Sequence, residues 1–283
     1  DSEQVMPASV FVHESSWENL EEVRTNELDR LRNAEELSGF PLEPRNWSDE
    51  LAALANRMSP GNSTAEYDLL QSDTAVPTQH GVVRLAELVA QARHEVLILN
   101  AYIIPGEQMM TILRDAAGRG VRVRALTNSL ASNDVPAVTA KYKKYRRPLI
   151  EAGVELYEFA AHPEIQPGIV DTAPVEALFA GLHTKAVVVD RETVYVGSLN
   201  LDPRSIHLNT EMGLIISSPG LAEEVAAIAE RDMGPANSWR VQLDEDGELY
   251  WESSAGVVTR QPAQNSWQRF QMWLFGIAPE DQL

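Results

Sequence analysis

The sequence predicts an α/β protein in which a mixed β-sheet is flanked by helices and preceded by an N-terminal helical extension. From about residue 75, apolar runs of strand length alternate with stretches of helix length. Such alternation is typical of a sheet covered by helices on both faces. Before residue 75, apolar residues recur at helical spacing among carboxylates instead. We therefore expect two regions, 1–74 and 75–283.

The region 1–74 is predicted to be a helical connector or extension with little chemistry of its own. Residues 14–31 interleave six carboxylates with leucine and valine, which indicates an acidic amphipathic helix. Prolines then interrupt the chain, and a second short helix is predicted over residues 49–58.

The region 75–283 is predicted to be one domain whose elements follow from periodicity and turn residues. Ser218 and Pro219 indicate the start of a helix, as an N-cap and a first-turn proline. The pair Asp246-Gly247 indicates the turn of a β-hairpin. The predicted helices cover residues 82–92, 107–117, 137–151 and 219–231. The predicted strands cover residues 95–99, 121–126, 154–159, 184–189, 193–197, 211–217, 239–243 and 248–252.

Composition narrows the classes of function. The net charge of −19 repels phosphate backbones, so we expect no nucleic-acid partner. Cysteine is absent, which excludes disulfides and cysteine–zinc sites. No apolar run reaches 18 residues, so no transmembrane helix is expected. The first ten residues lack the basic and apolar regions of a signal peptide, so none is expected there.

Polar residues at fixed offsets carry the candidate chemistry: His183, Lys185, Asp190, Ser198 and Asn200. Residues two apart on a strand point to the same face, so His183 projects with Lys185, and Ser198 with Asn200. On neighbouring strands these groups would form a phosphate pocket, with a general acid or nucleophile among fixed donors. Asp190 lies at the strand end, an odd number of residues from Lys185. We expect it to orient or neutralise rather than touch the phosphate.

The run HTKAVVVDRETVYVGSLNLDPRS, residues 183–205, resembles the phospholipase D superfamily. The resemblance implies a layered α/β fold and two such motifs that face each other across a pseudo-twofold axis. One histidine attacks phosphorus and forms a phosphohistidine, and the other protonates the leaving alcohol and then activates the incoming nucleophile. The resemblance also implies that no metal or cofactor is needed, and that Glu211 orients the histidine.

A more specific resemblance covers about residues 75–283. Asn100-Ala-Tyr102, the run TNSLASNDVPAVTAKYKKYRRPLIEAGVELYEF and the tail segments WRVQLDEDGELYWES and VVTRQPAQNSWQRFQMWLF are similar to the carboxy-terminal half of bacterial cardiolipin synthases of the C type. This implies phosphatidyl transfer, with phosphatidylglycerol and phosphatidylethanolamine as substrates. It also implies a peripheral protein on the cytoplasmic side of the bacterial inner membrane.

The chain departs from the family in carrying one motif instead of two, because no other histidine is followed by lysine two residues on. By order, His183 belongs to the family's second motif and is expected to be the general acid and base. Lys185 and Asn200, with Ser198 assisting, are expected to bind the phosphoryl oxygens. We favour the second half of a longer protein as the explanation. The alternatives are a homodimeric single-motif phosphodiesterase and a non-catalytic half that binds lipid or another subunit.

A basic cluster stands out against the acidic background. Lys143, Arg146 and Arg147 share one helical face at their spacing. The functional interpretation is a docking patch for anionic lipid head groups, and the alternative is a solvated helix face.

Aromatic residues crowd the last part of the sequence, where Ser266 is a candidate helix cap. Trp267, Phe270, Trp273 and Phe275 favour the membrane–water interface, so they predict a peripheral anchor that lies in it. The alternative is that these rings pack against the domain.

Overall fold

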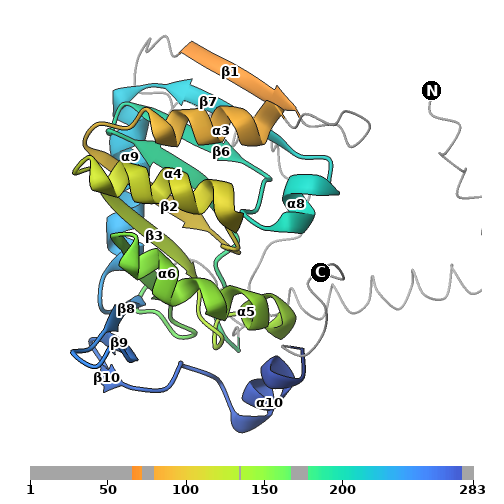
Figure 1. Cartoon of the computed structure of the whole chain (residues 1–283), viewed down its shortest axis with the longest axis vertical. Helices are drawn as coiled ribbons and strands as arrows, with labels where there is room; N and C mark the ends of the chain where they lie inside the picture. Colours follow the sequence, from red (N-terminus) through yellow and green to blue (C-terminus); the bar gives the residue numbers. More distant parts are fainter. Residues whose placement is uncertain (1–65, 72–79, 134, 167–177, 276–283) are drawn as a thin grey trace, which may run out of the picture. The chain divides into compact units, whose positions relative to one another are not determined.

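A single ten-stranded sheet organises the computed structural model, which describes residues 66–71, 80–133, 135–166 and 178–275 (Figure 1). The strand order is β1-β7-β6-β5-β2-β3-β4-β8-β9-β10. The pairs β2–β3 and β3–β4 are parallel, and all other pairs are antiparallel. The strands are β1 Glu66–Gln71, β2 Glu95–Asn100, β3 Arg122–Asn128, β4 Val154–Phe159, β5 Lys185–Val189, β6 Thr193–Gly197, β7 Met212–Ser217, β8 Ser238–Leu243, β9 Leu249–Ser253 and β10 Gly256–Val258.

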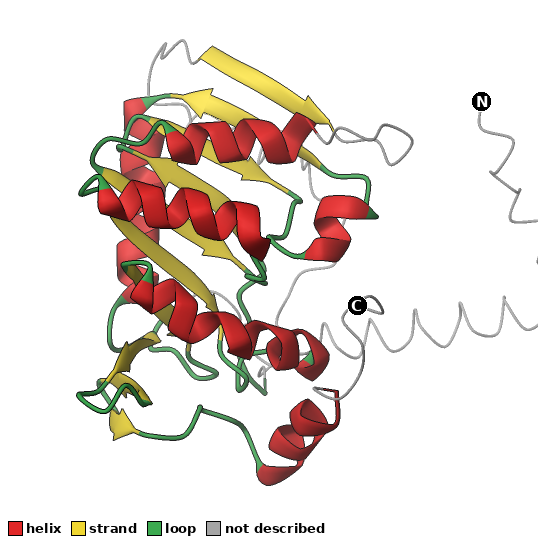
Figure 2. Ribbon diagram, viewed as in Figure 1, coloured by secondary structure: helices red, strands yellow, loops and turns green. Residues whose placement is uncertain are grey.

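Helices cover both faces of this sheet (Figure 2). On one face, α3, α4 and α6 enclose the larger apolar core, and on the other α9 encloses a smaller one. A further helix, α10, packs against α5. The helical elements are α3 His80–Ala90, α4 Gly106–Gly118, α5 Pro136–Tyr142, the 3₁₀ turn η2 Lys143–Tyr145, α6 Arg146–Glu151, α8 Pro203–His207, α9 Pro219–Met233 and α10 Ser266–Phe275.

Local sequence explains the element boundaries. The Ser218 side chain accepts a hydrogen bond from the Leu221 backbone, and Pro219 occupies the first turn of α9. Gly153, between α6 and β4, has a φ of 90°, and a Cβ there would lie 2.9 Å from the Cβ of Ala117. This turn therefore needs a glycine, both for its left-handed backbone and for the close approach of α4.

The predicted α/β class, with a mixed sheet flanked by helices, is confirmed. The strands predicted over 154–159 and 193–197 and the hairpin of β8 and β9 are also confirmed. The helix predicted over 137–151 is interrupted by η2. The predicted N-terminal helices lie outside the described residues. Within the predicted connector, Glu66–Gln71 forms β1 and pairs with β7 as an edge strand of the sheet.

Candidate active site

Four of the motif residues, His183, Lys185, Ser198 and Asn200, lie at the edge of the sheet where β2 and β6 end and β5 begins. Asn100, at the end of β2, is the ladder partner of Lys185, the first residue of β5. The next residue of β5, Ala186, is paired with Val196 of β6, one residue before Gly197. The antiparallel register therefore brings the start of the His-x-Lys segment to the Gly-Ser-x-Asn turn.

Asn100 fixes the backbone around Asn200. Its side-chain amide donates to the Leu199 carbonyl at 3.1 Å, and its side-chain oxygen accepts from the Leu201 N–H at 3.2 Å. Both bonds are buried, so they hold this turn in one conformation. The side-chain oxygen of Asn200 is itself buried and finds no hydrogen-bond partner among the residues that the structure describes. A buried acceptor without a donor is costly, and a ligand with a donor group would satisfy it.

Ser198 and Glu211 contact each other, as two predicted site residues should. The Ser198 hydroxyl donates to the Glu211 carboxylate, and the same hydroxyl accepts from the Met212 N–H at 3.1 Å. The Asn209 amide donates to the other carboxylate oxygen of Glu211 at 3.1 Å. Glu211 is buried, and these donors fix its position beside the turn.

Residue 197, next to Ser198, must be glycine because the Tyr195 side chain packs against it and against Gly213 of the neighbouring strand β7. A Cβ on Gly197 would lie 2.5 Å from the Tyr195 hydroxyl, and one on Gly213 would lie 2.5 Å from its ring. Burial raises the pKa of Tyr195 to about 12, so this phenol stays neutral and acts as a support. The glycine of the Gly-Ser-x-Asn motif is therefore explained by packing.

Lys185 is a buried cation beside two carboxylates. Its ammonium group donates to the backbone carbonyl of His183 at 2.8 Å. Burial lowers the pKa of Lys185, and the negative charges of Glu211 and Asp202 act in the opposite direction. The ammonium group is thus held at the His183 backbone and adds positive charge at this end of the sheet.

His183 is exposed, and the backbone of the preceding residue, Leu182, is held by the side chain of Asn128 at the end of β3. The Asn128 side chain accepts from the Leu182 N–H and donates to the Leu182 carbonyl, both at 2.8 Å. The imidazole of His183 makes no hydrogen bond to any described residue. The predicted contact between Glu211 and this imidazole is therefore not formed here, since Glu211 is engaged with Ser198 and Asn209.

Asp190 lies away from this site, which corrects its place among the catalytic residues. It follows the far end of β5, roughly 17 Å from Lys185 at the usual rise of a strand. Its carboxylate accepts from the backbone N–H groups of Arg93, His94 and Glu95, at 2.7 to 3.2 Å. Asp190 therefore closes the turn between α3 and β2, and it does not orient or neutralise the groups of the site.

The three residues of the basic cluster, Lys143, Arg146 and Arg147, differ in how far they are buried. Arg146 is only 2% exposed and pairs with the fully buried Glu158 at 2.6 Å, so its assignment to a head-group patch is wrong. The reason is that α6 turns this position into the core, over β4. Lys143 and Arg147 are exposed as predicted, and Arg147 lies 3.9 Å from Glu248.

The aromatic residues of α10 lie on the surface. Trp267 is 62% and Trp273 57% exposed. Phe270 lies between them, stacked on Trp267 with 5.4 Å between ring centroids and tilted against Trp273 with 5.9 Å between centroids. The opposite face of α10 is polar, because the buried Gln268 donates to the Leu130 carbonyl at 2.6 Å. The cap of this helix is Asn265, which accepts from the Gln268 N–H at 2.9 Å, and the prediction of Ser266 as the cap is wrong. Leu274 and Phe275 are also exposed.

A cavity of about 320 Å³ beside Asn200 is lined mostly by residues that the sequence did not single out as a site. Its walls come from the loop after β2, from α5 and η2, and from α8. Asn100 and Asn128 do not line this cavity, but as polar residues that end apolar strands they could have indicated the neighbouring site from the sequence. The residues that line the cavity lie too far apart in the sequence to be grouped. The polar lining residues are Tyr102, Lys141, Lys144, Tyr145, Asn200, Asp202, Arg204, Ser205 and Asn209.

Comparison with known proteins places this geometry in a family. Residues 85–233 match a family model described as "Cardiolipin synthase, PLD-like domain". Cardiolipin synthase C of Escherichia coli K12 is 33% identical over 71% of this chain and 43% of its own length. Cardiolipin synthase A of Pseudomonas aeruginosa PAO1 is 38% identical over 52% of this chain and 26% of its own length. The resemblance inferred from the motifs is confirmed, and the chain spans less than half of these relatives.

Solved structures give similar matches at low identity. Nuc of Salmonella typhimurium, a phospholipase D family member, is 21% identical with a TM-score of 0.46, over 62% of this chain and 99% of its own. Phosphatidylserine synthase of Haemophilus influenzae Rd KW20 is 17% identical with a TM-score of 0.46, over 69% of this chain and 48% of its own.

Proposed function

This chain belongs to the family of cardiolipin synthase, PLD-like domains, and on that premise we propose that it supplies the second catalytic motif of a phosphatidyltransferase that makes cardiolipin. The acceptor would be phosphatidylglycerol, and the donor a phospholipid such as phosphatidylethanolamine. One observation carries the proposal: the single motif converges with Asn100 and Glu211 at one end of the sheet, within the matched region.

In the proposed mechanism, the histidine of the family's first motif, which is supplied from outside these residues, attacks phosphorus and displaces the head-group alcohol of the donor. His183 gives the leaving oxygen its proton, and then takes a proton from the hydroxyl of the acceptor, which attacks the phosphohistidine. General acid–base catalysis of this kind is worth roughly 10²–10⁴-fold. Lys185 and the Asn200 amide, with Ser198, stabilise the phosphoryl oxygens, as fixed donors do at developing negative charge. Glu211 orients the imidazole once substrate or the other motif is in place.

The exposure of His183 supports a site that a second motif completes. We propose the missing half of a longer chain as its source. A second copy of this chain, acting as a phosphodiesterase or phospholipase D-like hydrolase, is the alternative that the single motif also permits. A non-catalytic half that binds lipid is the other.

The test measures hydrolysis of bis(p-nitrophenyl) phosphate, with EDTA present, by this chain and by His183→Ala. The matched control is His94→Ala, since His94 is exposed at the other end of the sheet. Turnover by the chain and the control, and none by His183→Ala, would mean that two copies complete the site. No turnover by a folded chain would favour the half-site, and the assay would then use the chain joined to a first-motif half. In either format, His183→Ala with more than a few per cent activity would refute the assignment.

We further propose that the protein is peripheral to the membrane, through the aromatic face of α10. None of the helices in the described ranges is long and apolar enough to span a bilayer. The exposed rings of Trp267, Phe270, Trp273 and Phe275 form an apolar surface of the kind that inserts at the head-group level. Lys143 and Arg147 remain candidates for contact with anionic head groups.

A further inference from the structure

We propose that two adjoining cavities beside Asn200 form one groove for a single anionic phospholipid. The polar cavity, of about 320 Å³, would hold the phosphate and a hydroxyl-bearing head group. The apolar cavity, of about 230 Å³, would hold the start of an acyl chain. This inference rests on the proposed function and assigns a substrate-binding role to residues outside the motif.

The polar cavity carries positive charge on a chain whose net charge is −19. Lys141, Lys144 and Arg204 line it, and they come from α5, η2 and α8. Its one described carboxylate, Asp202, accepts from the Ser205 N–H at 2.9 Å as the N-cap of α8. Three cations and one carboxylate leave these lining residues with a net positive charge, which attracts the single negative charge of a phosphodiester.

Asn200 makes the polar cavity specific for more than a phosphate. Its buried side-chain oxygen finds no donor among the described residues, and the oxygens of a phosphodiester, which carry no proton, cannot supply one. A ligand that carries a hydroxyl next to its phosphate would satisfy this oxygen, while the Asn200 amide donates to the phosphate. A glycerol head group offers both chemical groups.

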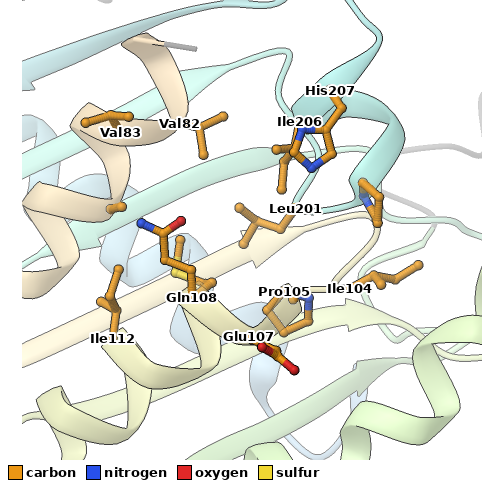
Figure 3. A pocket seen from close by; sticks show the side chains of 14 residues that line it. Val82, Val83, Ile104, Pro105, Glu107, Gln108, Ile112, Leu201, Ile206 and His207 are labelled. Atoms are coloured by element: carbon orange, nitrogen blue, oxygen red, sulfur yellow. The ribbon is translucent and has the colours of Figure 1, made fainter. Parts of the chain in front are cut away.

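The apolar cavity lies between α3, α4 and α8 (Figure 3). Figure 3 shows Val82 of α3 and Ile112 of α4 on the opposite side from Ile206, with Leu201 between them. Its polar side chains are Glu107, Gln108 and His207. Burying methylene groups here is favourable because it removes apolar surface from water.

The two cavities adjoin because Ile104 and Pro203 line both. The Ile104 N–H donates to the Leu201 carbonyl at 2.6 Å, which joins the loop after β2 to the loop after β6. With the cap at Asp202, this bond holds the shared wall in place before any ligand binds. An amphipathic molecule with an anionic head and an apolar tail fits that arrangement, whereas free phosphate uses only one end.

Isothermal titration calorimetry tests the groove with three ligands: dihexanoyl-phosphatidylglycerol below its micelle concentration, deacylated glycerophosphoglycerol, and inorganic phosphate. We expect the short-chain lipid to bind more than tenfold more tightly than its deacylated form, and inorganic phosphate most weakly. Equal affinity for the lipid and its deacylated form would refute the acyl part. Equal affinity for phosphate and glycerophosphoglycerol would refute the role of Asn200.

Two variants locate the binding site. Val83→Glu places a carboxylate at the half-exposed edge of the apolar cavity, where 43% of Val83 is exposed, so the fold should tolerate it. It should weaken lipid binding at least fivefold and leave glycerophosphoglycerol unchanged. The matched control is Ile228→Glu on α9, which is 44% exposed on the other face of the sheet. Equal effects of the two variants would overturn the proposal.

Failure of the groove and failure of the proposed function are separable, because binding needs no turnover. A chain that binds the lipid in the predicted order but shows no dependence on His183 would support the groove and refute the catalytic role. A chain whose turnover depends on His183 but which shows no preference for the lipid would support the catalytic role and refute the groove.

Discussion

Replacement of Asn128 by alanine should loosen the segment that carries His183. The Asn128 side chain is buried and makes four hydrogen bonds at 2.8 to 3.2 Å, to Ala101, Leu182 and Ser132. The Ala101 carbonyl keeps a second donor, the Thr127 hydroxyl at 3.1 Å. Alanine therefore leaves the N–H and the carbonyl of Leu182 without their side-chain partner.

The expected cost follows from those two backbone groups. A buried polar group left without a partner costs about 1–3 kcal/mol, so Asn128→Ala should lower the free energy of unfolding by roughly 2–6 kcal/mol. Urea denaturation measures this change. Amide hydrogen exchange at Leu182 measures whether the loss is local, and exchange there should accelerate more than in the core strands.

The control is Asn237→Ala, which removes a similar pair of partly buried bonds to the backbone away from the site. Asn237 accepts from the Ile165 N–H at 3.1 Å and donates to the Arg231 carbonyl at 2.8 Å. It should destabilise the fold without selective exchange at Leu182. If Asn128→Ala changes the free energy of unfolding by less than about 1 kcal/mol, or if both variants affect Leu182 equally, the reasoning is wrong.

The remaining predictions concern a turn, an ion pair and the aromatic helix. Burial raises the pKa of Asp190 but three backbone donors outweigh it, so the pKa is lowered. Its contribution to stability is present above the unfolded pKa of about 3.9 and is lost as the pH falls through the folded value. Asp190→Asn should cost about 1 kcal/mol at pH 7, because these bonds lie near solvent and asparagine keeps an acceptor oxygen, and denaturation curves should converge with wild type in acid. Glu158→Gln should cost about 3–5 kcal/mol in urea denaturation, because it leaves Arg146 buried without its counter-charge; a loss below 1 kcal/mol would contradict this. Trp273→Glu should reduce co-sedimentation with phosphatidylglycerol vesicles severalfold, and Tyr67→Glu, at an exposed position of β1, should not; equal effects would exclude α10 as the anchor.

Most of the fold could be predicted because its signals are local. The apolar runs of β2 and β4 and the cap at Ser218 depend on neighbours within a few residues. Two features had no such signal. The exposed strand β1 joins the sheet only through its pairing with β7. Arg146 is a basic residue in a helical run, and nothing nearby in the sequence indicates that it pairs with a buried carboxylate.

The sequence by itself identified the family and the residues of its motif: a histidine, a lysine, a serine and an asparagine at strand spacing. The tertiary structure alone decided which groups share a site. It placed Asp190 at the far end of β5, gave Asn128 control of Leu182, 54 residues away, and gathered Lys144 and Arg204 around Asn200. The physical reason is that spacing along a strand fixes only which face a side chain points to. Burial and hydrogen bonding across the sheet depend on pairing partners that lie far apart in the chain.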